Sequence, residues 1–303
     1  FRKLLAPQKA ARFHSSSNQF FHFQIFKLSH FQITLMRSKE LKQLVKEKYG
    51  RIAKQNSENQ SCCCGSSCCG PEVDYTVFSE DYKDREGYNP DADMSLGCGI
   101  PTDFAGIKPG DHVLDLGSGA GNDCFVARAL VGETGKVTGL DMTEQMVAKA
   151  RENCGKLNFE NVEFVLGDIE KMPFDDGLFD VVISNCVLNL VPDKSKAFSE
   201  IYRVLKPGGR FCVSDVVIRG NLSEKIRKDA EMYAGCISGA SEMNDYLKVA
   251  ETTGFLNINI HKQKEIKLPE SLLSEYNNQQ ELKSFKTGET GIFSITVSAS
   301  KSF

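Results

Sequence analysis

The fold of this chain is decided by one stretch of sequence, Val113-Leu-Asp-Leu-Gly-Ser-Gly-Ala-Gly121. An apolar strand runs through an acid, Asp115, and into three closely spaced glycines. Glycines let backbone amides come close to a ligand at the carboxyl end of a strand, where the next helix also points its free amides. The stretch therefore predicts a pocket for a nucleotide-containing cofactor.

The spacing of the glycines narrows the class of cofactor. Gly117, Gly119 and Gly121 form the pattern G-x-G-x-G, and Asn122 stands where the dinucleotide fingerprint G-x-G-x-x-G has its third glycine. This departure disfavours NAD or FAD and favours S-adenosylmethionine. Because any tight strand-to-helix turn can carry such glycines, the segments that follow have to support the interpretation.

Strands and helices alternate after this turn. A first strand begins at Val113, and hydrophobic periodicity predicts strands over 136–141, 162–168, 179–185 and 210–215 and helices over 121–131, 143–157 and 194–206, the last stopped by Pro207-Gly-Gly209. Alternating apolar residues at 255–262 and 291–299 predict an antiparallel pair that closes the sheet edge. The chain is thus predicted to be an α/β protein with a doubly wound, mainly parallel seven-stranded sheet, whose ligand lies at the carboxyl ends of the strands.

Two acids follow the second and third predicted strands. Asp141 comes twenty residues after Gly121, the distance expected of a carboxylate that accepts both ribose hydroxyls. Asp168 ends the third strand, where it can accept from an adenine amino group or cap a turn. Both positions fit the rim of one cofactor pocket.

These motifs as a set resemble the class I S-adenosylmethionine-dependent methyltransferases, which have a Rossmann-like fold. The resemblance rests on Leu-Asp-Leu-Gly-Ser-Gly, the acid after the second strand, Gly-Asp after the third and Leu-Lys-Pro-Gly-Gly before the fifth, and it covers residues 101–217. It implies that the cofactor's methionine portion is lined by Asp115, Gly117 and Gly119, its ribose by Asp141, one adenine face by Met142, and the adenine edge by Asp168 with Ile169.

Eleven cysteines in 303 residues bear on the methyl acceptor. The chain is long enough for a full core and shows no cleavable secretory signal, so we expect reduced thiols rather than a disulfide scaffold. Cys124, Cys154 and Cys212 are expected at packing or surface positions. Another three, Cys98, Cys186 and Cys236, fall in loops that the fold brings to the cofactor crevice. Three thiolates without a His or carboxylate suit a soft centre, either zinc or trivalent arsenic.

The segments around these three cysteines resemble the arsenite methyltransferases. They are Ser95-Leu-Gly-Cys-Gly-Ile-Pro101, Ser184-Asn-Cys-Val-Leu-Asn-Leu-Val-Pro-Asp193 and Tyr233-Ala-Gly-Cys-Ile-Ser-Gly-Ala240, and the likeness runs from about Met36 to the last of them. The resemblance implies that Cys98, Cys186 and Cys236 hold arsenic(III) and that a fourth cysteine assists its transfer. It does not single out which of Cys62, Cys63, Cys64, Cys68 and Cys69 plays that part.

The expected reaction methylates arsenite that arrives as a thiol complex, with methylated arsenicals as products in detoxification. The arsenic lone pair attacks the methyl carbon, so no general base is needed and the protein contributes proximity, orientation and desolvation. Electrons come from enzyme thiols or from glutathione or thioredoxin. Two alternatives stay open: a methyltransferase of an organic small molecule, and a soft-metal-binding or redox module built on residues 62–69.

The remaining expectations concern organisation and location. Residues 1–35 are basic and lack acids, which predicts a targeting peptide or a non-native, disordered extension; 36–70 form a helix and Cys-rich linker, 71–265 the methyltransferase domain with the arsenic site, and 266–303 a C-terminal extension with the closing strand. No apolar run is long enough to span a membrane, and a net charge of −3 gives no case for nucleic-acid binding. We expect a cytoplasmic monomer.

Overall fold

The computed structural model describes residues 38–54, 80–228, 236–237, 239–268 and 270–303. The chain divides into two units, Phe1–Leu41 and Lys42–Phe303, and the fold below is that of the second. The predicted extension 1–35 and the cysteines at 62–69 lie outside the described residues, so those predictions stay untested.

Helices and strands alternate as the hydrophobic pattern predicts. Residues 38–54 are helical. The later elements are η2 (Pro101–Asp103), β1 (His112–Leu116), α2 (Asn122–Val131), β2 (Lys136–Asp141), α3 (Glu144–Leu157), β3 (Val162–Leu166), β4 (Phe179–Asn185), η3 (Leu188–Leu190), α4 (Lys194–Val204), β5 (Leu205–Arg219), α5 (Glu224–Lys228), α7 (Met243–Thr253), β6 (Leu256–Ile266), α8 (Glu270–Tyr276), α9 (Gln279–Thr287) and β7 (Gly291–Ser300).

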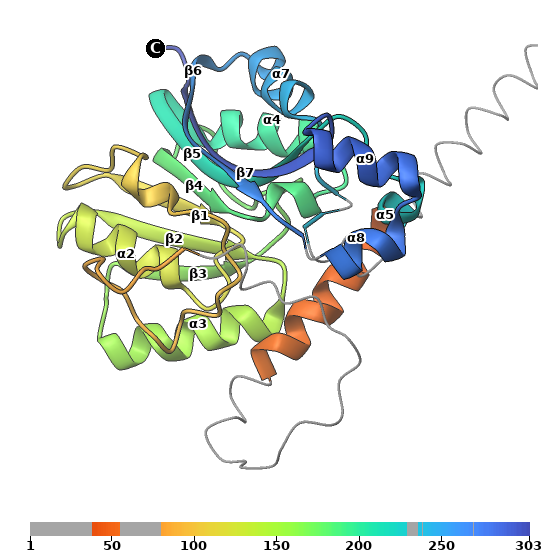
Figure 1. Cartoon of the computed structure of the whole chain (residues 1–303). Coiled ribbons are helices and arrows are strands. Elements are labelled where there is room, and N and C mark those ends of the chain that lie inside the picture. The colour runs from red at the N-terminus through yellow and green to blue at the C-terminus, as the bar shows by residue number, and fades with distance from the viewer. Residues whose placement is uncertain (1–37, 55–79, 229–235, 238, 269) are drawn as a thin grey trace, which may run out of the picture. The chain divides into compact units, whose positions relative to one another are not determined.

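The strands form one seven-stranded sheet in the order β3-β2-β1-β4-β5-β7-β6. The first five strands are parallel, while β7 runs antiparallel between β5 and β6. Helices α2 and α3 cover one face of the sheet, and α4 and α7 cover the other (Figure 1). The predicted doubly wound sheet and its antiparallel closing pair are confirmed, and β7 belongs to the same sheet as the rest.

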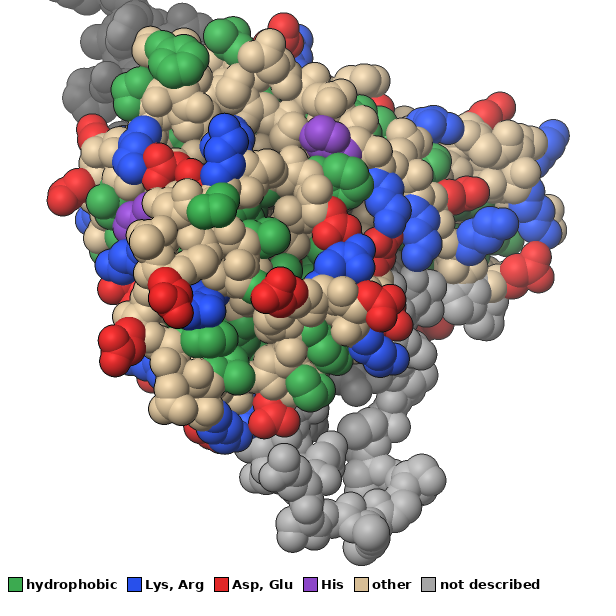
Figure 2. Space-filling view, turned by 90° about the vertical axis from the view of Figure 1, so that its left-hand side faces the viewer, with side chains coloured by type: hydrophobic (Ala, Val, Ile, Leu, Met, Phe, Trp, Pro, Cys, Tyr) green, Lys and Arg blue, Asp and Glu red, His purple; other side chains and the backbone are tan. Residues whose placement is uncertain are grey.

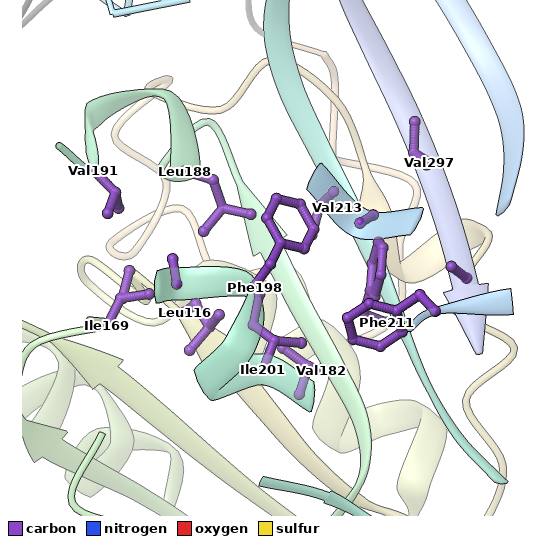
Figure 3. Packing of buried hydrophobic residues seen from close by; sticks show 14 of the residues in the cluster. Leu116, Ile169, Val182, Leu188, Val191, Phe198, Ile201, Phe211, Val213 and Val297 are labelled. Atoms are coloured by element: carbon purple, nitrogen blue, oxygen red, sulfur yellow. The ribbon is translucent and has the colours of Figure 1, made fainter. Parts of the chain in front are cut away.

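Apolar side chains alternate between the two faces of the sheet along each buried strand, and so they contribute to a first core beneath α2 and α3 and a second core beneath α4. In β1, Val113 packs toward α2 and α3, whereas Leu114 and Leu116 pack toward α4. This is the period of two expected when both faces of a parallel sheet are covered. Figure 3 shows Phe198 and Ile201 of α4 pointing at the strand residues of the second core.

Several predicted boundaries were wrong, those on either side of Pro207 most of all. The helix predicted over 194–206 ends at Val204, and the strand predicted over 210–215 runs from Leu205 to Arg219. A residue before proline is disfavoured in helical conformation, so Pro207 ends the helix earlier than the apolar pattern suggests. The extension at the other end follows from ten paired residues between β5 and β7, a long-range contact without a local signal.

The strand order reverses between β1 and β4. Strands β2 and β3 lie on one side of β1, and β4 and β5 lie on the other side. Ligands of doubly wound sheets bind at such a switch point, beyond the carboxyl ends of the strands.

No helix among the described residues is long and apolar enough to cross a membrane. Acidic and basic side chains are interspersed on the face shown in Figure 2. The domain boundaries, the cytoplasmic location and the monomeric state stay predictions.

Candidate active site

A pocket opens at the switch point, and the predicted cofactor-binding residues lie together in its wall. Its lining includes Asp115, Gly117, Gly119, Asp141, Met142, Asp168, Ile169 and Cys186. They come from the ends of β1, β2 and β4 and from the turn that follows β3. The sequence therefore located the pocket correctly, although the role of each residue within it is not tested by its position.

The glycine turn after β1 is tied to β2 and has a shape that only glycine fits at one position. The amides of Gly117 and Ser118 donate to the Leu140 carbonyl at 2.7 and 3.1 Å. Gly117 has a φ of +68°, and a Cβ there would lie 2.4 Å from Cγ2 of Val187. Gly119, with a φ of +51°, faces open space, so its backbone is accessible to a ligand.

The Asp141 carboxylate holds this turn in place. Its two oxygens accept from the amides of Gly119 at 3.0 Å and Thr143 at 2.8 Å. Burial raises the pKa of Asp141, and the amide contacts oppose that shift. A carboxylate that lies at the end of β2 and in the pocket wall is suited to accept from a ribose diol.

Two further acidic side chains lie in the pocket wall, Asp115 buried and Asp123 partly buried. Burial raises the pKa of Asp123 to about 6, although Tyr82 and Asn185 donate to it at 2.8 and 3.1 Å. Burial also raises the pKa of Asp115 well above its ordinary value, with the neighbouring Asp123 adding to the effect. Asp115 therefore favours its protonated form, and Asp123 is the carboxylate that offers a negative charge here at neutral pH.

Unsatisfied polar atoms show that the pocket fits a polar ligand. Among the described residues, Ser118 Oγ and Asn122 Oδ1 are buried in the pocket wall without a hydrogen-bond partner. Buried polar atoms normally have partners, so these two indicate a ligand with matching groups. Together with the accessible glycine backbone and the acids, they fit an amino-acid-bearing nucleoside such as S-adenosylmethionine.

The predicted adenine end carries an ion pair that the sequence did not reveal. Lys42 Nζ lies 2.6 Å from Asp168 Oδ2 and 2.5 Å from Glu170 Oε2. Burial raises the pKa of Asp168, but the hydrogen bonds from Lys42 and from the Glu170 amide, together with the nearby positive charges, leave the pKa below its ordinary value. Asp168 is therefore ionised at neutral pH and able to accept.

The three predicted arsenic ligands are buried and adjoin one another. Contacts with the thiols of Cys236 and Cys98, and then burial, raise the pKa of Cys186 well above its ordinary value. The Cys236 thiol also donates to the Cys186 carbonyl at 3.4 Å. Burial raises the pKa of Cys98. Of the three, Cys186 lines the cofactor pocket, and the other two belong to the same buried cluster as Cys186.

The backbone fixes two of these residues in an uncommon shape. Cys186 and Cys236 have φ values of +60° and +69°. The Cys186 amide donates to the Ser214 carbonyl at 2.7 Å, and the Cys98 amide donates to Asn185 Oδ1 at 3.0 Å. In the described part of the chain, no three His, Cys, Asp or Glu side chains are already arranged for a metal ion. The cluster is thus three adjoining thiols that must adjust to take a ligand.

The other described cysteines behave mostly as predicted. Cys154 and Cys212 are buried in the core beneath α2 and α3. Cys124 is buried there too, but its thiol also donates to Asp115 Oδ2 at 3.2 Å and so contacts a residue of the pocket wall. The expectation that Cys124 only packs was incomplete.

Sequence reasoning missed the network that joins the thiols to the pocket. Asn185 Nδ2 donates to the Tyr82 hydroxyl, the Gly99 carbonyl and Asp123, while its oxygen holds Cys98. The only signal in the sequence was the position of Asn185 at the end of the fourth predicted strand. No feature of the sequence around Tyr82 indicated that this residue belongs to the site.

Known methyltransferases match this chain in sequence and in structure. A family model described as a methyltransferase domain matches residues 107–267. The crystal structure of an arsenic(III) S-adenosylmethionine methyltransferase from Chlamydomonas reinhardtii matches with 38% identity and a TM-score of 0.57, and the match covers 68% of each chain. The chain belongs to the arsenite methyltransferase family.

Two curated members of this family support the assignment. The arsenite methyltransferase of Halobacterium salinarum is 42% identical over 73% of this chain and 59% of its own length. That of Aquipseudomonas alcaligenes is 34% identical over 76% of this chain and 66% of its own length. The matched region is thus shorter than two thirds of either relative. Family and fold class are confirmed, and S-adenosylmethionine is the methyl donor named for the Chlamydomonas protein.

Proposed function

We propose that this chain methylates trivalent arsenic, presented as a thiol complex, with S-adenosylmethionine. The observation that carries the proposal is the contact of three buried thiols, one of which, Cys186, also lines the cofactor pocket. An organic methyl acceptor has no need of three adjoining thiols, whereas a soft, three-coordinate centre does. The names of the relatives agree with this acceptor.

The pocket residues hold the cofactor in this proposal. Asp141 accepts from the ribose, Met142 covers one adenine face, and Asp168 with Ile169 borders the adenine edge. Asp115 and the amides of the glycine turn receive the methionine portion. When bound, S-adenosylmethionine supplies a methyl group activated by a sulfonium. Burial of the surrounding side chains excludes water, which strengthens every electrostatic contact in the site.

The thiols take the substrate by exchange. The raised pKa values of Cys98 and Cys186 keep these thiols protonated at neutral pH. For each cysteine, an S–As bond forms, the As–S bond to the carrier thiol breaks, and the cysteine's proton leaves on the carrier thiol. No separate base is required, because the leaving thiolate takes the proton.

Methyl transfer then uses the lone pair of arsenic. A C–As bond forms as the C–S bond breaks, and the sulfur of the departing S-adenosylhomocysteine keeps that electron pair. Arsenic is formally oxidised by two electrons, which two thiols return by forming one disulfide. We infer that glutathione or thioredoxin reduces that disulfide, that detoxification is the role, and that a cytoplasmic monomer does the work. The protein's own contribution is to hold the arsenic beside the methyl group.

A comparison of single serine variants tests the proposal. Cys186→Ser and Cys236→Ser are expected to abolish formation of methylated arsenicals from arsenite, labelled S-adenosylmethionine and a thiol reductant, because a protonated hydroxyl is a poor ligand for a soft centre. Cofactor affinity by calorimetry should stay near that of the parent. Cys154→Ser is the control, since Cys154 is buried in the core beneath α2 and α3, outside the cluster that holds the three thiols.

Two outcomes would contradict the proposal. Persistent arsenite methylation in both serine variants would mean that the thiols are incidental and that an organic acceptor is the natural substrate. Mass mapping after alkylation gives a second measure, because arsenite should protect Cys98, Cys186 and Cys236 together. Protection confined to residues 62–69 would favour the soft-metal module instead.

A further inference from the structure

Two side chains between the end of β4 and the start of α4 hold the backbone around Cys236: Asn189 of η3 and Lys194, the first residue of α4. Asn189 Nδ2 donates to the Cys236 carbonyl at 2.8 Å. Lys194 Nζ donates to the Gly239 carbonyl at 3.0 Å. The same connection carries Cys186 at its start, so both links join the surroundings of one thiol to those of another.

Asn189 is itself fixed from behind. Its side chain is completely buried, and its backbone amide donates to the Asp215 carboxylate on β5. That carboxylate also accepts from the Tyr246 hydroxyl of α7 at 3.0 Å. The Cys236 carbonyl is therefore attached, through one amide side chain, to the central sheet and to a helix packed on it.

Lys194 is placed in a way that packing alone does not explain. Its ammonium donates to three backbone carbonyls, those of Gly239, Asn189 at 3.4 Å and Val191 at 3.4 Å, and it makes no ion pair within the described part of the chain. Removing a charge from water is costly unless the site gives it suitable partners. A lysine that gives its protons to carbonyls of two different loops gains those partners only when the loops are held together.

We propose that Asn189 and Lys194 are positioning residues that dock the backbone of Cys236 and Gly239 onto the β4–α4 connection and so keep the third thiol against Cys186. This inference rests on the proposed function. Neither residue touches arsenic or cofactor; each acts through the Cys236 backbone. Without these links Cys98 and Cys186 still adjoin, because Asn185 and Ser214 hold them separately.

The test uses the full-length protein with Lys194→Met and Asn189→Leu, which keep side-chain size but remove the donors. The KM for arsenite is expected to rise roughly tenfold, the effect of losing one hydrogen bond that positions a ligand. The affinity for S-adenosylmethionine should not change. In alkylation mapping, arsenite should still protect Cys98 and Cys186 but should leave Cys236 reactive.

Two controls keep the result interpretable. Lys248→Met removes an exposed lysine of α7 and should behave as the parent. Lys194→Arg retains a cationic donor and should recover part of the protection of Cys236. Thermal melts of all variants show whether each one folds.

The proposal is wrong if folded Lys194→Met and Asn189→Leu proteins show the parent's KM and protect all three cysteines. It is also wrong if cofactor affinity falls in parallel with the arsenite response, because the two residues would then support the fold in general. Failure of the parent protein to methylate arsenite, or to protect its thiols, would instead refute the proposed function.

Discussion

Replacing Asp141 removes two kinds of contact at once, and the structure separates them. Its carboxylate accepts from the amides of Gly119 at 3.0 Å and Thr143 at 2.8 Å, and it faces the pocket where we place the ribose. Asp141→Ala therefore removes support from the glycine turn as well as the acceptor for the ligand. Asp141→Asn keeps one acceptor oxygen and removes the charge.

The two losses have different sizes. A ribose diol donating to a carboxylate contributes about 1.5–3 kcal/mol, so Asp141→Ala should weaken S-adenosylmethionine binding roughly 10- to 150-fold. Two buried amides left without an acceptor should lower the free energy of unfolding by about 2–4 kcal/mol. Asp141→Asn should lose most of the affinity and about half of that stability, because an amide oxygen can still accept from one of the two donors.

Calorimetric titration with S-adenosylmethionine and urea unfolding of the ligand-free protein measure the two terms. The matched control is Asp193→Ala, since Asp193 also accepts from a backbone amide, that of Lys196 at 3.0 Å, but lies outside the pocket at the start of α4. It should cost about 1 kcal/mol of stability and no affinity. If Asp141→Asn binds the cofactor as tightly as the parent, the ribose contact is refuted and Asp141 only supports the turn.

Three more predictions concern the same region. Gly117→Ala should destabilise the protein by about 2–4 kcal/mol in urea unfolding, because its Cβ would meet Val187 and its φ is positive; a change below about 1 kcal/mol would mean that the turn relaxes. The raised pKa of Asp215, about 7 through burial, means that the folded state binds its proton more tightly than the unfolded state does. The contribution of Asp215 to the free energy of unfolding is thus complete below about pH 4 and is lost as the pH rises through 7, a change of a few kcal/mol. Asp215→Asn should flatten this dependence of the free energy of unfolding on pH. A variant with the same pH profile as the parent would contradict the prediction. Cys124→Ala should weaken cofactor binding by roughly fivefold, whereas Cys124→Ser should not, because the hydroxyl still donates to Asp115. Equal cofactor affinities of the two variants would show that this hydrogen bond does not contribute to binding.

The sheet could be predicted because its signal is local. Each parallel strand contains an apolar run, and its neighbours along the chain are its neighbours in space or one crossover away. The same locality revealed the pocket, since Gly117, Asp141 and Asp168 all stand at strand ends. Because a parallel sheet brings the carboxyl ends of its strands to one edge, the residues at and just after those ends make up much of the pocket wall.

The contacts that join the thiols to the pocket could not be predicted. Asn185 meets Asp123 across 62 residues, and Asn189 meets Cys236 across 47. Such pairs leave no periodic pattern in the sequence, because each contact joins single residues that are far apart along the chain. Resemblance supplied the three cysteines but not the residues that hold them, and Lys194 looked like an ordinary first residue of a helix.

Backbone strain gives an argument for the thiol site that does not depend on any relative. The described non-glycine residues with positive φ are Ser95, Asn158, Cys186, Cys236 and Asn257. Asparagine tolerates this conformation, but cysteine gains nothing from it, and a side chain there costs about 1–2 kcal/mol that glycine would avoid. Glycine at 186 or 236 would relieve that strain and lose only the thiol. Strain held at two buried, adjoining cysteines, each fixed by a hydrogen bond from another element, is the pattern expected where the side chain itself is used.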